Sequence, residues 1–232
     1  MSVAVIVPYR AGCPHREAAW GWVQDRYATT CPDWDIVVGD SPTGPWCKAL
    51  AVLDALRRTT ADRLVIADAD VWCEQVRQAT ETPHPVVIPH RLVLRLDQSS
   101  TDRLLAGEQG EPTLDRYPYT GRAGGGVTIL TRDVWNQVPM DPRFIGWGQE
   151  DDAWWLAMIA VLPRPVRFKH DLIHLWHPPQ PKMFPQRDGE GEPPPQWGSP
   201  ESKALLERYE EARIRPDTMR ALIAEFAEEM AA

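Results

Sequence analysis

The chain has 232 residues, of which 43% are hydrophobic and 25% charged, and this is enough to bury the core of one sizeable domain without disulfides. Its net charge of −8 and a pI near 5.3 argue against a broad phosphate-tracking surface, so nucleic acid and anionic membranes are disfavoured as partners. The four cysteines form no C-x-x-C pair, which excludes a zinc ribbon and a thioredoxin motif.

The first third of the chain alternates strand and helix patterns. Val3–Pro8 is a continuous β-branched run, typical of a strand buried on both faces. Apolar residues recur at three- and four-residue spacing over Arg16–Tyr27, and Cys47–Arg58 carries an apolar stripe, so both segments are predicted helices. "WDIVVGDSP" and "DRLVIADAD" are the second and third predicted strands. This order predicts a right-handed α/β winding that binds ligands beyond the carboxyl ends of its strands.

The N-terminus also bears on location. The apolar run in "MSVAVIVPYR" has no basic lead-in, no cleavage site and too little length to cross a bilayer. We therefore expect no membrane span and a cytoplasmic protein.

The middle of the chain is less regular. "PVVIPHRLVLRL" is strand-like, whereas "QSSTDRLLAGEQGEPTLDRY" carries turn signals and is expected to loop over the surface. "AGGGVTILTRDVWNQV" predicts a strand and a short helix, and a further helix is expected up to Val161. "VRFKHDLIHLWHPP" predicts a last strand.

The C-terminal part changes composition sharply. Residues 179–200 are rich in proline, glycine and charge, which predicts a flexible loop that could serve as a lid. Ser199 is a predicted N-cap, followed by helices over Pro200–Arg213 and Pro216–Met230. We thus expect one α/β domain over residues 1–178, the loop, and a helical pair over 201–232 packed on the same domain.

A pair of carboxylates follows the third predicted strand. Asp68 and Asp70 share a face if the chain stays extended, so both can point at one hard cation or at ligand hydroxyls. A plain strand-ending turn is the alternative.

Two histidines lie in "HLWH", near the end of the last predicted strand. A neutral imidazole is a good ligand for a transition metal and favours Mn²⁺ over Mg²⁺ beside carboxylates. Alone, His174 and His177 could each be a satisfied structural histidine. Asp70 makes His174 a candidate ligand.

The stretch "RFIGWGQEDDAWW" gathers three consecutive acidic residues beside a tryptophan between glycines. Neighbouring carboxylates raise one another's pKa, which suits a general base for a hydroxyl nucleophile. Trp147 offers an indole face to a sugar ring. The alternative is an acidic first turn that the helix dipole stabilises. The glycines of "GRAGGGV" form no phosphate loop and serve either close approach of a ligand or tight packing.

Taken in order, "VPYR", Asp40, "ADADV", "GGGVTILTRDVW", "DPRFIGWGQEDD" and "HLWH" resemble the metal-dependent nucleotide-sugar glycosyltransferases of the GT-A fold. "FIGWGQEDD" is most similar to the GWG-x-ED signature shared by beta-1,4-galactosyltransferases, the galactosyltransferase-like part of polypeptide N-acetylgalactosaminyltransferases and bacterial chondroitin-type polymerases. The resemblance covers roughly Ser2–Pro178. It implies a Rossmann-like α/β fold with a mixed, mostly parallel central sheet flanked by helices, here with a C-terminal helical appendage.

The resemblance also implies a role for each matching residue. On the nucleotide side the matching residues are Pro8, Tyr9 and Arg10, which would line the pocket, Asp40, which would contact uracil or ribose, and Asp68, which would hold ribose or help place the metal. At the metal they are Asp70 and His174, the expected ligands of Mn²⁺ or Mg²⁺, and His177, expected nearer the diphosphate. On the sugar side they are Trp147 and Glu150, which would shape the donor and acceptor pocket, and Asp151, the expected base.

The implied reaction moves a hexose or N-acetylhexosamine from a UDP-sugar to an acceptor hydroxyl, and the Glu150–Asp151 pair favours inversion. The acceptor could be a glycan, a lipid-linked sugar or a protein, with a modified DNA base least favoured. Two other classes stay open: a metal-dependent phosphohydrolase or nucleotidyltransferase, which leaves the GWG segment unused, and a non-catalytic sugar-nucleotide-binding module. The terminal helices could cap the sheet, contact the acceptor or form a homodimer.

Overall fold

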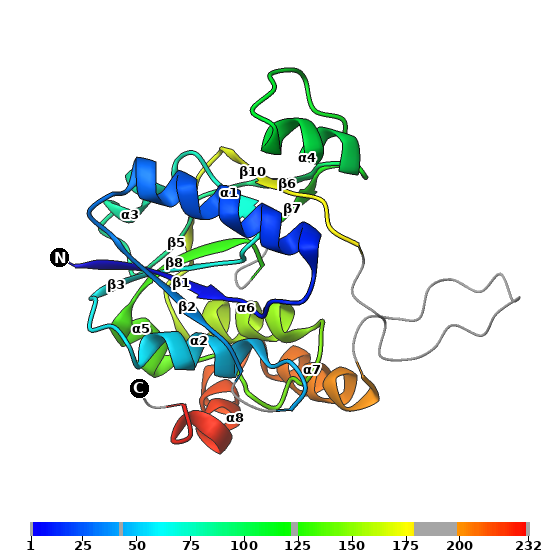
Figure 1. Cartoon of the computed structure of the whole chain (residues 1–232). Coiled ribbons are helices and arrows are strands. Elements are labelled where there is room, and N and C mark those ends of the chain that lie inside the picture. The colour runs from blue at the N-terminus through cyan, green and yellow to red at the C-terminus, as the bar shows by residue number, and fades with distance from the viewer. Residues whose placement is uncertain (1, 42–43, 122–124, 179–198, 231–232) are drawn as a thin grey trace, which may run out of the picture.

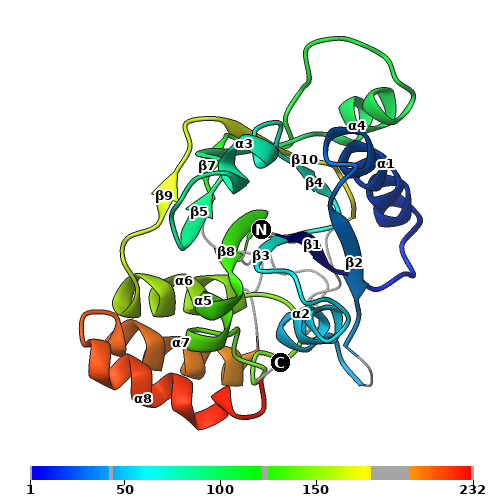
Figure 2. The same ribbon diagram turned by 90° about the vertical axis from the view of Figure 1, so that its left-hand side faces the viewer.

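The computed structural model describes residues 2–41, 44–121, 125–178 and 199–230. Its centre is a six-stranded sheet with strand order β2-β1-β3-β8-β5-β9, covered by helices on both faces (Figures 1 and 2). Three of the five strand pairings are parallel and two are antiparallel. The expected α/β class, with a mixed and mostly parallel sheet flanked by helices, is confirmed.

The first three strands form the parallel part of this sheet. They are β1 (Val3–Pro8), β2 (Asp35–Gly39) and β3 (Arg63–Ala67), joined by helices α1 (Pro14–Thr30) and α2 (Lys48–Leu56). The strand-helix order read from the sequence is therefore confirmed. Gly39 is needed at the end of β2, because a Cβ there would lie 2.0 Å from the carbonyl oxygen of Ala51 in α2.

The second half of the sheet mixes directions. Strand β8 (Val127–Thr131) runs antiparallel to both β3 and β5 (Val86–Ile88), and β9 (Val166–Arg167) is the edge strand beside β5. The helices of this half are α3 (Val76–Thr80), α5 (Arg132–Gln137) and α6 (Glu150–Val161).

A second, four-stranded sheet has the order β4-β10-β6-β7 and was not expected from the sequence. Its strands are β4 (Val71–Trp72), β6 (Leu92–Arg95), β7 (Tyr119–Thr120) and β10 (Asp171–His174). "PVVIPHRLVLRL" breaks at its internal Pro-His-Arg into β5 and β6, and "VRFKHDLIHLWHPP" likewise divides into β9 and β10. Each divided segment therefore contributes one strand to each sheet.

The expectation of a surface loop after β6 was partly wrong, because α4 (Gln98–Leu105) forms there. Asp97 is its N-cap, and its Oδ1 accepts a hydrogen bond of 2.7 Å from the backbone N–H of Ser100. The polar composition that predicted turns is therefore the composition of a capped, half-exposed helix. Thr101 lies inside it and accepts a hydrogen bond from the backbone N–H of Trp176 at 2.8 Å.

The core lies on both faces of the central sheet. In β1, Ala4 and Ile6 pack toward α2, α5 and α6, whereas Val5 and Val7 pack toward α1 and α3. This period-two division of a fully apolar strand is what burial on both faces requires.

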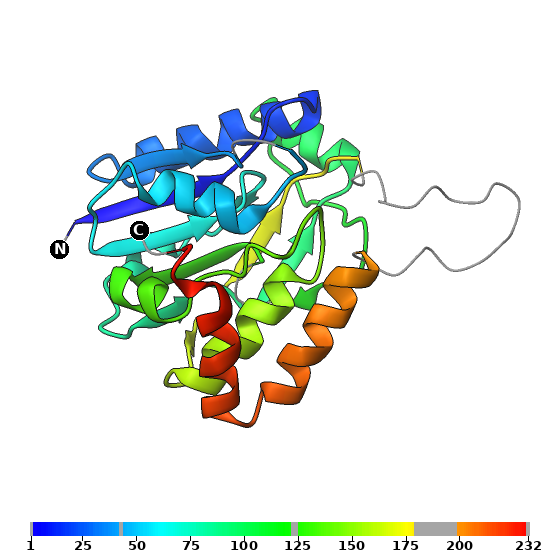
Figure 3. The same ribbon diagram turned by 90° about the horizontal axis from the view of Figure 1, so that it is seen from below.

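The two C-terminal helices, α7 (Pro200–Ala212) and α8 (Pro216–Ala227), lie side by side with α6 (Figure 3) and share its hydrophobic cluster. Ser199 caps α7 as expected, and its Oγ accepts a 3.1 Å hydrogen bond from the N–H of Ser202. The expected lid falls almost entirely on residues 179–198, which lie outside the described ranges. None of the helices in the described ranges has the length and apolar character that crossing a bilayer requires.

One buried carboxylate ties these helices to the segment before α6. The Asp141 side chain, 2% exposed, pairs with Arg143 at 2.7 Å and accepts a 2.9 Å hydrogen bond from the Tyr209 hydroxyl of α7. Arg143 also pairs with Glu225 of α8, which pairs in turn with Arg208 of α7. Both helices thus contact the start of the stretch that leads into α6.

Replacing Tyr209 with phenylalanine should destabilise the protein without changing its shape. The variant removes one donor from a buried carboxylate, which costs about 1–3 kcal/mol in the free energy of unfolding. Urea denaturation measures this change. Tyr117→Phe is the control, because Tyr117 is 95% exposed and should be neutral; equal stability of the two variants would contradict the role given to the Asp141 bond.

Candidate active site

Most of the residues singled out in the sequence gather at one edge of the central sheet. Pro8 ends β1 and lies beside Gly39, the last residue of β2, in the parallel register. Asp40 follows β2 directly, and Asp68 follows β3. The carboxyl ends of three adjacent parallel strands therefore meet there, as the winding predicts.

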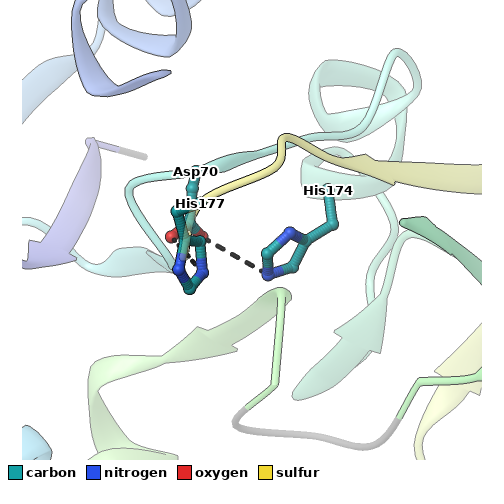
Figure 4. Close-up of side chains that lie close together, drawn as sticks. All are labelled: Asp70, His174 and His177. Atoms are coloured by element: carbon teal, nitrogen blue, oxygen red, sulfur yellow. Dashed lines mark ion pairs between the residues drawn. The ribbon is translucent and has the colours of Figure 1, made fainter. Parts of the chain in front are cut away.

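A cluster of one aspartate and two histidines lies at this edge where β10 runs beside β4 (Figure 4). The Nε2 atoms of His174 and His177 lie 3.8 and 3.4 Å from the two carboxylate oxygens of Asp70. The register that pairs His174 with Val71 brings these residues together across about a hundred positions of sequence. The structure therefore places His177 as close to Asp70 as His174.

The hydrogen bonds of the two imidazoles suit metal binding. His174 Nδ1 lies 2.8 Å from the carbonyl oxygen of Leu175, and His177 Nδ1 lies 2.8 Å from that of Pro178. A carbonyl only accepts, so each Nδ1 carries the proton and each Nε2 presents a lone pair. A backbone carbonyl orienting the far nitrogen in this way is typical of metal-ligating histidines. The three side chains thus fit a divalent transition metal such as Mn²⁺.

Arg16 of α1 reaches into the same cluster. Its Nε lies 3.1 Å from Asp70 Oδ2, and its guanidinium lies over the ring of Tyr9. Burial raises the pKa of Asp70, but its interactions with His174, Arg16 and His177 outweigh burial, so the net pKa is lowered. Asp70 is therefore held as a carboxylate, the form that binds a cation.

Asp68 and Asp70 have different partners. Strand β3 ends at Ala67 and a turn follows, so the alternation expected of an extended D-x-D does not continue. Asp68 Oδ2 accepts a 2.8 Å hydrogen bond from the N–H of Gly126. Gly126 has φ +82°, and a Cβ there would lie 3.0 Å from Leu172. Tight packing accordingly explains Gly126, whereas Gly124 lies outside the described ranges.

Lys48 joins Asp68 to the acidic start of α6. Its Nζ lies 2.7 Å from Asp68 Oδ1 and 3.0 Å from Asp151 Oδ1, and its side chain is 7% exposed. Burial opposes the charge on Lys48, but the charges of Asp151, Asp68 and Glu150 outweigh burial and raise its pKa. Lys48 is therefore a buried ammonium shared by carboxylates from two elements.

Glu150 and Asp151 occupy the first turn of α6 together with Asp152. Burial, reinforced by the charge of Asp151, raises the pKa of Glu150. Burial also raises the pKa of Asp151, which Lys48 partly counteracts. Two neighbouring carboxyls with raised pKa values are suited to proton transfer near neutral pH.

The expected nucleotide side is organised by Arg10. Its Nε lies 2.8 Å from Asp40 Oδ1, and its Nη2 donates a 2.8 Å hydrogen bond to the Ser41 hydroxyl. The guanidinium also lies over the indole of Trp46. Tyr9 is buried beside Arg16, and within the described ranges its hydroxyl has no hydrogen-bond partner. The structure thus brings Arg10 and Asp40 together, and it leaves the Tyr9 hydroxyl able to hydrogen-bond to a ligand.

The GWG segment connects this side to α6. The N–H of Gly146 donates a 2.7 Å hydrogen bond to the carbonyl of Trp46, and Trp147 is 40% exposed. Gly146 and Gly148 have φ +90° and +103°, and Gln149 has φ +76°, where a non-glycine residue is strained. The Oε1 atom of Gln149 is buried with no hydrogen-bond partner among the described residues.

Three residues of the site were not predicted from the sequence: Arg16, Lys48 and Gln149. Lys48 could have been noticed in the sequence, because it is the one charged residue among the first six of α2 and the other five are apolar. Arg16 and Gln149 carried no such signal, because an arginine on an amphipathic helix and a glutamine in a polar turn are ordinary.

No protein-family model and no curated protein matches the chain. Among solved structures, a mutant of Drosophila beta-1,4-galactosyltransferase 7 in complex with manganese, UDP-Gal and xylobiose is similar at 15% identity and a TM-score of 0.44. That match covers 72% of this chain and 64% of the other.

Two further similar structures are glucosyl-3-phosphoglycerate synthase from Mycobacterium tuberculosis, in complex with phosphoglyceric acid, and a glycosyltransferase involved in glycosylation of the major capsid of PBCV-1. The first has 15% identity, a TM-score of 0.43 and coverage of 78% of this chain and 73% of the other. The second has 10% identity, a TM-score of 0.39 and coverage of 75% and 93%. At such scores the likeness assigns no activity and no residue role.

Asp70→Asn should weaken Mn²⁺ binding strongly. The variant removes the carboxylate between the two Nε2 atoms, so the loss should be at least the roughly 10–100-fold seen when only an outer partner of a metal ligand is lost. Calorimetric titration with Mn²⁺ measures it. Asp217→Asn, which alters a fully exposed carboxylate, is the control. Equal affinities of both variants and the parent would rule out this cluster as the metal site.

Gln149→Gly should stabilise the protein. It relieves about 1–2 kcal/mol of left-handed strain at a cost of about 0.5–1 kcal/mol in chain entropy. The melting temperature should rise by a few degrees, roughly 2–4 °C per kcal/mol at this size. Gln137→Gly, at an exposed position of α5, should lower it instead. A fall in both variants would show that Gln149 is not strained.

Proposed function

We propose that the chain is a metal-dependent glycosyltransferase of the GT-A type, moving a hexose or N-acetylhexosamine from a UDP-sugar to an acceptor hydroxyl. The observation that carries the proposal is that Lys48 joins Asp151 to Asp68, which lies two residues before Asp70 of the Asp70-His174-His177 cluster. A cation-binding cluster and a candidate base thus share one site. Such a pairing is what glycosyl transfer from a nucleoside diphosphate needs.

On the donor side, Arg10 and Asp40 are proposed to hold the uridine, with Pro8 and Tyr9 forming the wall of its pocket. The support is the Arg10–Asp40 pair at the carboxyl ends of β1 and β2 and the unpartnered Tyr9 hydroxyl. Asp68 is proposed to accept a hydrogen bond from a donor hydroxyl, since its carboxylate is about a quarter exposed.

At the metal, Asp70 and His174 are the proposed ligands, and His177 is close enough to Asp70 to be a third or to face the diphosphate. Mn²⁺ or Mg²⁺ held by these residues would offset the negative charge that develops on the departing UDP. Trp147 is proposed to lie against a sugar ring, because its indole is partly exposed between two glycines that have positive φ.

In this proposal the two carboxyls of α6, Asp151 and Glu150, have different roles in proton transfer. Burial raises the pKa of Asp151 to about 6 and that of Glu150 to about 8. Near neutral pH, Asp151 is the group that is ionised and able to accept the acceptor's proton, whereas Glu150 keeps its proton and can donate a hydrogen bond. Environments that separate two carboxyl pKa values in this way are typical of acid-base assignments. Removal of that proton as the hydroxyl attacks the anomeric carbon corresponds to inversion.

Asp151→Asn should abolish transfer and spare donor binding. The parent, screened against UDP-sugars with Mn²⁺, should release UDP, and NMR should show a product anomeric configuration opposite to that of the donor. The variant should lose about 10²–10⁴-fold in turnover, the usual contribution of a general base. Thermal stabilisation by UDP with Mn²⁺ should persist. Asp133→Asn, in the first turn of α5, is the matched control.

The pH profile tests the same assignment. Asp151 must be deprotonated to act, so turnover should rise with pH through about 6 and not near 4, the usual aspartate range. It should fall again as Glu150 loses its proton through about 8. Release of phosphate or pyrophosphate in place of UDP would favour a phosphohydrolase or nucleotidyltransferase. An inactive parent that binds UDP-sugar would favour a binding module.

A further inference from the structure

Lys48 stands out because it is a buried cation at the first residue of a helix. It is the first residue of α2, where the partial positive charge of the helix dipole disfavours an ammonium. Its side chain is almost fully buried, which disfavours the charged form further. A buried ion pair is also weak evidence for stability, because desolvation offsets most of the attraction.

The contacts of Lys48 point to function. Nζ lies 2.7 Å from Asp68 at the end of β3 and 3.0 Å from Asp151 at the start of α6. The side chains of Asp68 and Asp151 are 27% and 33% exposed, whereas the Lys48 side chain is only 7% exposed. The two carboxylates that face the site, Asp68 and Asp151, are thus held by the buried positive charge of Lys48.

We propose that Lys48 is the positioning residue of the base: it keeps Asp151 ionised and directs its Oδ1 toward Nζ, leaving the other carboxylate oxygen for the acceptor hydroxyl. The inference rests on the proposed function and deepens it. Lys48 does not touch the reacting atoms and acts through Asp151.

Among the ionisable groups around Asp151, Lys48 is the one that favours its ionised form. Asp68 from the end of β3 faces Asp151, as do Glu150 and Asp152 from its own helix. The charges of Asp68 and Asp152 favour protonation of Asp151, Glu150 keeps its proton near neutral pH, and Lys48 is the single cation among these four groups. Without Lys48, Asp151 would gain a proton at a higher pH and lose the contact that fixes its rotamer.

Sharing one ammonium also couples the donor side to the base. A donor hydroxyl that hydrogen-bonds to Asp68 draws negative charge away from Nζ, and the ammonium then interacts more strongly with Asp151. Occupation of the donor site therefore favours the ionised base, so proton removal is best supported when a donor is present.

Lys48→Met tests this, with Lys48→Arg as the conservative variant. In Lys48→Met, the acid limb of kcat/KM should move to higher pH by about 1–3 units, the range for loss of an opposite charge within 4–6 Å. Lys48→Arg should keep the limb close to that of the parent. Lys169→Met, which removes an exposed lysine between β9 and β10, should change nothing.

A second readout separates this inference from the proposed function. Carbon-13 NMR of labelled aspartate, with the Asp151 signal assigned by its loss in Asp151→Asn, follows the protonation of Asp151 directly. A midpoint that rises in Lys48→Met and returns in Lys48→Arg supports the inference, even if the parent shows no transfer and the proposed function fails. Two results would overturn the inference: an unchanged midpoint of the Asp151 titration in folded Lys48→Met, or reduced stability of that variant with an unchanged acid limb of kcat/KM. Lys48 would then contribute only to stability.

Discussion

Burial of the central sheet on both faces is the constraint on which the rest of the molecule depends. Alternate residues of β1 pack into two separate hydrophobic clusters, so neither face can hold a polar site. The groups of the candidate site therefore lie beyond the strand ends and on the segments that border them, where side chains can reach water. The second sheet, the turn after β3 and the start of α6 all border that edge.

Charge at this edge is arranged in matched pairs that follow the strand order. Arg10 pairs with Asp40 after β2, Lys48 with Asp68 after β3, and Arg16 with Asp70 in the next turn. Exposure falls along the series, since the Asp40 side chain is half-exposed and that of Asp70 is buried. Because screening by water weakens with burial, the two charges of an inner pair attract each other more strongly than those of the outer pair.

The sequence predicted the parallel half of the fold because apolar runs, turns and helical spacing agree there. It did not predict the second sheet, since β4, β6, β7 and β10 are two to four residues long and depend on one another for pairing. Asp70 and His174 were expected to share a metal, whereas the equally close approach of His177 to Asp70 was not expected. The proximity of His177 to Asp70 depends on the register of β10 against β4.

The segment between Asp141 and Glu150 connects the packing of α7 and α8 with the position of the site residues on α6. One end is fixed by the buried Asp141, which α7 and α8 surround through Tyr209 and the Arg143–Glu225 pair. Its middle is fixed at Gly146 by the carbonyl of Trp46, on which Arg10 lies. Its far end enters α6 through the strained Gln149. A segment held at three points can sustain such strain, because relaxing one residue would require breaking contacts at another. The C-terminal helices therefore act on the site through this segment: they fix where α6 begins, and with it where Asp151 meets Lys48.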